Sequence, residues 1–146
     1  MFSACFQDIP VTETIVPDSE TSENSATSSS QRTQFNEFTA NFEIYTLGTK
    51  RIFNLPMYHN QSADVFIEAN DPSLISVRRE GVTWNDFFET LPFSLTKECL
   101  ITGTKQTFCT DYNGTLRFIL NGVEQANSLD MSILEDDLLV VEYIKK

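Results

Sequence analysis

Two cysteines have the spacing that most clearly predicts chemistry in this chain. Cys99 and Cys109 end two half-strands, residues 99–102 and 106–109, around a three-residue turn. The loop has an odd number of residues and is centred on Thr104. If the two strands pair in antiparallel orientation, this loop places the cysteines directly opposite each other, close enough for a disulfide. Closing a ring of about eleven residues stabilises a fold by roughly 3 kcal/mol. We therefore expect a disulfide and a location outside the reducing cytosol, the alternative being two buried free thiols.

Other residues that could do chemistry are too few or wrongly spaced. Cys99 and Cys109 lack the neighbours of a zinc site and are too far apart for a CxxC redox pair. His59 is the single histidine, and with Met57 it offers only two ligands for copper. Asp111 opens a stretch that imitates a calcium loop but lacks its later ligands, so a hairpin turn is expected there. No catalytic or phosphate-binding motif is present. We expect no enzyme, no metal and no cofactor.

The third cysteine lies near the start of the sequence. Phe2-Ser3-Ala4-Cys5 resembles a prokaryotic lipobox, in which the cysteine is lipidated and becomes the first residue. The resemblance implies lipidation of Cys5 and a membrane anchor. A lipoprotein signal also needs a basic start and an apolar stretch before the box. Only four residues precede Cys5, so the start codon lies upstream, the chain is truncated or the match is chance.

Two N-x-[S/T] sequences mark Asn60 and Asn113 as acceptors for N-glycosylation. They would be used only if the chain is exported in an organism that glycosylates proteins.

Composition limits the class of partner. The chain has 10 Lys and Arg against 21 Asp and Glu, a net charge of −11. Such a body repels nucleic-acid phosphates and anionic lipid, so we expect no nucleic-acid partner and no membrane contact except through a lipid anchor.

The sequence divides into two segments. Residues 1–36 are rich in Ser and Thr, acidic and poor in large apolar side chains, which predicts a disordered tether. Residues 37–146 have the length and aromatic content of one packed domain.

Within the domain, short strands surround one helix. Thr83 and Asp86 form a capping-box pattern, and Trp84, Phe87 and Phe88 then share one helical face that must dock on a sheet. Asn121-Gly122 predicts a tight turn, and residues 132–137 a solvated polar turn with some helical character. The expected strands cover residues 41–47, 51–55, 64–69, 74–79, 99–102, 106–109, 115–120 and 138–144, the last of them central. We therefore predict an α+β domain, a mixed sheet with one short helix packed across it.

The end of the domain resembles the β-grasp, or ubiquitin-like, fold. It reads Leu116-Arg-Phe-Ile-Leu-Asn-Gly122, then Leu134-Glu-Asp-Asp-Leu-Leu-Val-Val-Glu-Tyr143, with Asp136 where many β-grasp domains have glycine. Residues 42–143 also resemble a group of small, uncharacterised prokaryotic surface proteins that share the capped Phe-Phe helix and the Cys-flanked hairpin. The resemblance implies a fold and no activity.

Three functions remain open at this stage. The leading hypothesis is a non-enzymatic extracytoplasmic interaction module, lipid-anchored at the cell surface, that binds a protein or glycan partner. One alternative is a small-ligand-binding β-grasp domain with a pocket formed by Tyr58, Trp84 and Phe93. The other is a cytosolic subunit of a larger complex with free thiols.

Overall fold

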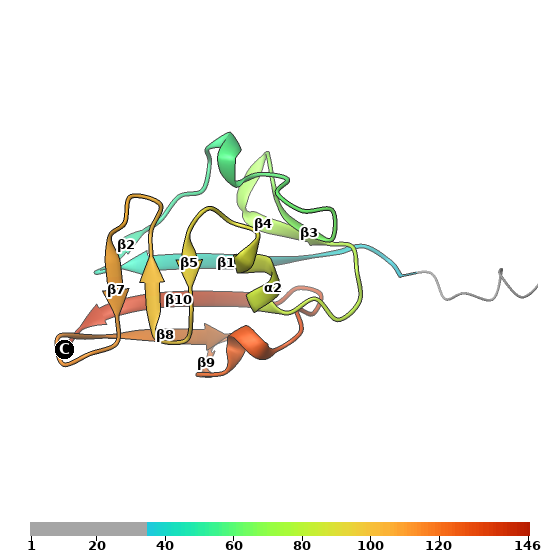
Figure 1. Ribbon diagram of the computed structural model, residues 1–146. Helices are drawn as coiled ribbons and strands as arrows, with labels where there is room; N and C mark the ends of the chain where they lie inside the picture. Colours follow the sequence, from blue (N-terminus) through green and yellow to red (C-terminus); the bar gives the residue numbers. More distant parts are fainter. Residues whose placement is uncertain (1–34) are drawn as a thin grey trace, which may run out of the picture. The chain divides into compact units, whose positions relative to one another are not determined.

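The computed structural model describes residues 35–146, which form two sheets and one α-helix (Figure 1). Most of the predicted tether, residues 1–34, therefore lies outside the described residues. The strands are β1 (Phe38–Thr46), β2 (Thr49–Lys50), β3 (Val65–Glu68), β4 (Asp71–Val77), β5 (Ser94–Leu95), β6 (Cys99–Ile101), β7 (Thr107–Cys109), β8 (Gly114–Leu120), β9 (Val123–Glu124) and β10 (Leu138–Lys145). The helices are the α-helix α2 (Trp84–Glu89) and two 3-10 turns, η2 (Pro56–Tyr58) and η3 (Ser128–Asp130).

The larger sheet is mixed and has the order β3-β4-β1-β10-β8-β9, with β2 paired to β1. Its two central strands, β1 and β10, run parallel, while β4 and β8 flank them in antiparallel orientation. The smaller sheet has the order β5-β6-β7. This arrangement confirms an α+β domain with a central final strand.

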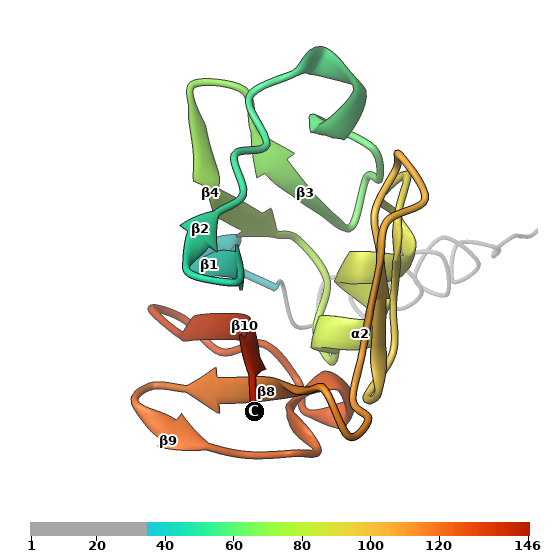
Figure 2. The same cartoon turned by 90° about the vertical axis from the view of Figure 1, so that its left-hand side faces the viewer.

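One face of the larger sheet carries the core. Side chains alternate along a strand, so β1 buries Phe42 and Ile44 and leaves Glu43 and Tyr45 half-exposed. Strands β8 and β10 alternate in the same way. Figure 2 shows α2 and the β6–β7 hairpin on the same side of the large sheet. They cover its apolar face.

The predicted helix is confirmed together with its cap. Thr83 Oγ1 accepts a hydrogen bond from Asp86 N at 3.0 Å, and Asp86 Oδ2 accepts one from Thr83 N at 3.0 Å. The buried helical face docks on β1, where the Phe42 ring lies 5.1 Å from Phe87 and 5.9 Å from Phe88.

The predicted return strand at residues 51–55 is wrong. Leu47 and Gly48 both have positive φ, so the turn comes one residue earlier than expected and β2 ends at Lys50. Arg51 N still donates to Ile44 O at 2.7 Å, after which the chain leaves the sheet. Pro56, which has no N–H for a ladder, then opens η2.

Two turns differ in detail from the expectation. The β3–β4 connection is shorter than predicted, because Glu68 already pairs with Asp71. The 3-10 turn η3 lies upstream of residues 132–137. Within that segment Asp137 is buried rather than solvated, and its carboxylate accepts hydrogen bonds from Asn121 Nδ2 at 2.8 Å and Leu134 N at 2.9 Å. Asp136 has φ 65°, a conformation that glycine adopts most readily.

The domain begins slightly before the predicted boundary at residue 37. Phe35, assigned to the tether, is half-buried against the core, with its ring 5.7 Å from that of Phe38.

Candidate binding site

The predicted disulfide is formed. Cys99 and Cys109 are cross-strand partners in the β6–β7 hairpin and are bonded through sulfur. The pairing continues to the tip of the hairpin, where Thr102 N donates to Gln106 O at 2.9 Å. The disulfide therefore closes the base of a hairpin whose tip projects away from it (Figure 1).

The tip of this hairpin forms one wall of a pocket of about 100 Å³ that is lined by aliphatic, aromatic and polar residues. The opposite wall is the segment after β2, here called the 51–58 segment, and Ile44 of β1 lies between the two. The full lining is Ile44, Arg51, Ile52, Phe53, Tyr58, Phe93, Leu100, Thr102 and Gly103.

Aromatic contacts fix the 51–58 segment on the domain. The Phe53 ring lies 5.4 Å from Phe42 in the core, 5.2 Å from Tyr58 and 5.5 Å from Phe93. His59 Nε2 lies 2.9 Å from Phe53 O and so joins the two ends of the segment. The single histidine is thus a structural residue here.

Exposed large apolar side chains are concentrated in residues 47–57, here called the rim, the stretch that supplies Arg51, Ile52 and Phe53 to the pocket. Leu47, Ile52, Leu55 and Met57 are four of the eight exposed large hydrophobic residues among residues 35–146. Ile52, at 57% exposure, also lines the pocket. Exposed apolar residues scattered singly need no explanation, whereas a concentration beside a pocket indicates an interaction surface.

A guanidinium lies beside this apolar rim. Arg51 Nε donates to Thr46 Oγ1 at 2.8 Å and Nη2 donates to Gln106 Oε1 at 3.2 Å. Its Cζ lies 5.4 Å from the centre of the Phe108 ring. Arg51 therefore connects β1 to the hairpin and holds its charge at the pocket margin.

The neighbouring Lys50 is paired. Its ammonium donates a hydrogen bond to Glu43, which raises the pKa of Lys50 above the usual 10.5 despite partial desolvation. The charge of Lys50 is thereby largely neutralised.

The size of the pocket limits what it can hold. Pockets for drug-sized ligands and cofactors have volumes of roughly 300–1,000 Å³, and a cavity of about 150 Å³ holds a benzene molecule. A pocket of about 100 Å³ suits one aliphatic side chain.

The pocket differs from the one expected from sequence. Tyr58 and Phe93 line it as predicted, but Trp84 is fully buried on the core-facing side of α2 and does not line the pocket. Arg51 and Ile52 were not expected, because alternation in a strand over residues 51–55 would have divided these residues between two faces. Pro56, soon after a run of apolar residues, is the signal that favours an exposed segment over a strand.

The remaining predicted positions lie away from the pocket or outside the described residues. Asn113 is exposed in the β7–β8 turn, where Asp111 Oδ1 accepts from Asn113 N at 2.7 Å and Gly114 N at 3.1 Å. Asp111 N also donates to Gly114 O at 2.9 Å, so a tight turn is present. The predicted hairpin is wrong, because β7 and β8 belong to different sheets and do not pair with each other. Asn60 is exposed just after η2, and Cys5 lies outside the described residues.

Two other kinds of feature are absent from residues 35–146. No group of three or more His, Cys, Asp or Glu side chains is placed to bind a metal ion. None of the helices described has the length and apolarity needed to cross a membrane.

Comparison of the chain with protein-family models, with curated proteins and with solved structures finds no match.

Proposed function

We propose that the domain is a non-enzymatic extracytoplasmic binding module that takes a protein partner at this pocket. The observation that carries the proposal is that four exposed large apolar side chains, Leu47, Ile52, Leu55 and Met57, fall within the short stretch of chain that forms one wall of a pocket with aromatic lining. In protein interfaces a few apolar anchors in such pockets provide most of the binding free energy.

The volume of the pocket favours a protein over a small molecule. A space of about 100 Å³ admits a single side chain and is well below the roughly 300 Å³ at which small-molecule sites begin. A protein partner would place one side chain in the pocket and cover the exposed rim with its neighbours.

The proposed location rests on the disulfide. A Cys99–Cys109 bridge is compatible with an oxidising compartment outside the cytoplasm. We further propose a lipid anchor at Cys5, supported by the lipobox-like sequence. Intact mass of the natively expressed protein tests both, since export and anchoring predict a two-hydrogen deficit, a diacylglycerol-sized addition and a new N-terminus at Cys5. An unmodified Met1 with three alkylatable thiols would contradict them.

We also propose that the domain is a β-grasp. A parallel central pair, β1 and β10, flanked by antiparallel β4 and β8 and crossed by α2, supports this assignment. An experimental structure whose superposition on ubiquitin-like domains failed to align these four strands would contradict it.

Site-specific photocrosslinking in the producing cells tests the binding function. A photoreactive amino acid at position 52 should give a discrete adduct with another protein. The matched control is position 123, since Val123 is equally exposed, at 59% against 57%, but lies on β9. Adducts of equal yield at both positions, or none at position 52, would overturn the proposed site.

A further inference from the structure

We infer that the partner segment carries a carboxylate next to the aliphatic side chain that fills the pocket, and that Arg51 binds this carboxylate. The inference rests on the proposed function and specifies the chemistry of its ligand. Three features of the pocket margin carry it, namely the unpaired charge of Arg51, the fixed position of its guanidinium and its place in the pocket wall.

Arg51 differs from the other arginines that the structure describes. Arg78 pairs with Glu37 at 2.8 Å, Arg79 with Asp64 at 3.0 Å and Arg117 with Glu142 at 2.7 Å. Within residues 35–146 no carboxylate lies within ion-pair distance of Arg51. The guanidinium of Arg51, at the pocket margin, is therefore available to make charge-assisted hydrogen bonds to an acidic group of a ligand.

The guanidinium is held in place before any ligand binds. Thr46 Oγ1 and Gln106 Oε1 accept from Nε and Nη2, and the Phe108 ring lies against Cζ. Among the described residues, nothing accepts a hydrogen bond from Nη1. A positioned guanidinium loses less conformational entropy on binding a carboxylate than a freely rotating one does.

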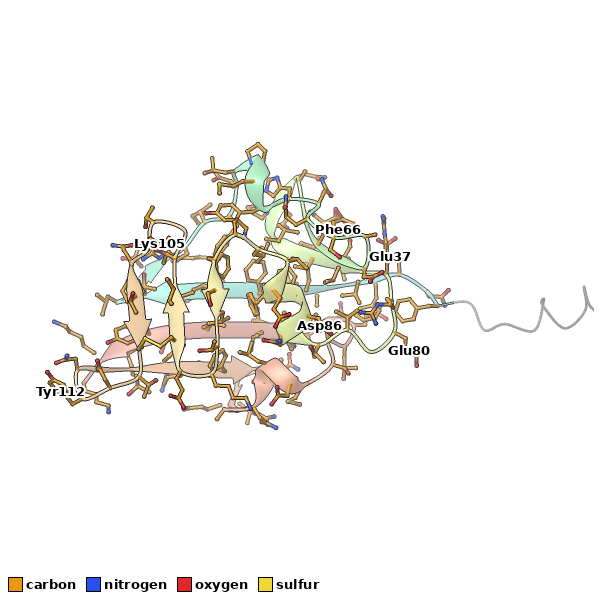
Figure 3. All side chains as sticks on the ribbon, in the orientation of Figure 1. Glu37, Phe66, Glu80, Asp86, Lys105 and Tyr112 are labelled. Atoms are coloured by element: carbon orange, nitrogen blue, oxygen red, sulfur yellow. A yellow bond between two sulfur atoms is a disulfide. The ribbon has the colours of Figure 1, made fainter. Side chains whose placement is uncertain are left out.

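The electrostatic surroundings favour a single acidic contact. Glu43 neutralises Lys50, so the nearest ammonium on β2 adds little. Lys105 forms no ion pair with the residues described and stands at the tip of the β6–β7 hairpin, as Figure 3 shows. A partner acid therefore meets Arg51 first, with Lys105 adding long-range attraction.

Arg51 also lines the pocket itself, beside Ile52. One ligand residue can therefore fill the pocket while an adjacent acid reaches the guanidinium. Acid next to an aliphatic residue is the motif that these observations specify.

Selection from a random dodecapeptide phage library against the oxidised full-length chain tests the inference. Enriched sequences should place Asp or Glu beside Leu, Ile, Met or Val. The best peptide and its Asp→Asn or Glu→Gln version would then be titrated by fluorescence anisotropy. Enrichment of aliphatic residues without an adjacent acid would overturn the inference.

Variants of the full chain assign the contacts. Arg51→Gln should weaken the acidic peptide about tenfold or more, because a charge-assisted hydrogen bond is lost. It should weaken the neutral peptide clearly less, because that peptide loses only the contribution of the Arg51 side chain to the pocket wall. Arg78→Gln, which also removes one arginine charge, is the control. Its affinity for the acidic peptide should stay within about twofold of the wild-type value.

Failure of the inference can be distinguished from failure of the proposed function. Ile52→Gln should abolish binding of either peptide, with Val123→Gln as its control. Loss with Ile52→Gln but not with Arg51→Gln would overturn the carboxylate contact alone. Binding that neither variant affects, or no enrichment at all, would overturn both.

An occupant from the same chain is a separate outcome. Residues 1–34 contain five carboxylates, at Asp8, Glu13, Asp18, Glu20 and Glu23. Changing all five to amides in the full chain should leave the peptide affinity unchanged. A tenfold gain in peptide affinity would mean that this segment competes with the peptide for Arg51. It would overturn the inference that the carboxylate comes from another protein.

Discussion

The helix α2 and the 51–58 segment pack against the same aromatic ring of β1, yet they use their apolar residues differently. Phe42 contacts Phe87 and Phe88 of the helix and also Phe53 of the segment. The helix buries its aromatic face completely, whereas the segment buries Phe53 and exposes Ile52, Leu55 and Met57.

The difference follows from local structure. A capped helix repeats one face every three to four residues, so its apolar side chains all reach the core. The 51–58 segment has no such repeat and is fixed by Phe53 and His59. Its other apolar side chains contribute little to folding, which leaves them available for a partner. Stability measurements can test this division.

The largest expected effect is on the helical side. Phe88→Ala removes a ring buried to 1% exposure and should lower the free energy of unfolding by about 3–5 kcal/mol. Ile52→Ala should change it by about 0.5 kcal/mol or less. Urea denaturation of both variants measures the difference, and similar losses would show that the rim belongs to the core.

The second-largest loss of stability is expected on removal of the disulfide. Cys99→Ser with Cys109→Ser should cost about 3 kcal/mol, because the unfolded chain loses its cross-link. The same change frees the hairpin that forms a pocket wall, so peptide binding should weaken as well. Guanidinium denaturation and peptide titration measure the two effects, with Cys5→Ser as the control. Unchanged stability would indicate that the backbone hydrogen bonds between β6 and β7 hold the hairpin without the disulfide.

A smaller effect is expected at the cap of α2. Thr83→Ala removes the acceptor for Asp86 N and should destabilise the domain by about 1 kcal/mol, whereas Thr83→Ser should retain most of the stability. Thermal unfolding followed by circular dichroism measures this. Thr83 does not line the pocket, so peptide affinity should not change, and a loss would link the two regions more closely than described here.

The smallest effect belongs to the Lys50–Glu43 pair. Lys50 is 40% exposed, so solvent screening limits the contribution of the pair to about 1 kcal/mol or less. Its pKa is raised by the hydrogen bond to Glu43, so this stability is present below pH 10.5 and is lost as the pH rises through the higher folded value. The stability difference between the wild type and Lys50→Gln should therefore vanish at strongly alkaline pH. A difference that persists there would assign the effect to packing.

Local sequence signals predicted the helical side well. The capping box, the apolar repeat after Thr83 and the Asn121-Gly122 turn each depend on neighbouring residues, and so does the register of Cys99 and Cys109. The pocket depends instead on where β2 ends. The positive φ of Leu47 moved that turn by one residue, and the hairpin tip that completes the pocket is distant in sequence. Neither feature has a local signature.

The parallel pairing of β1 with β10 also affects when the domain can fold. These strands come from opposite ends of the described sequence and lie side by side at the centre of the sheet. Contacts of such long sequence separation slow folding, and the sheet cannot close before residues 138–145 have been synthesised. A chain that ends before residue 138 would therefore leave β1 without its parallel neighbour and the two halves of the sheet unjoined.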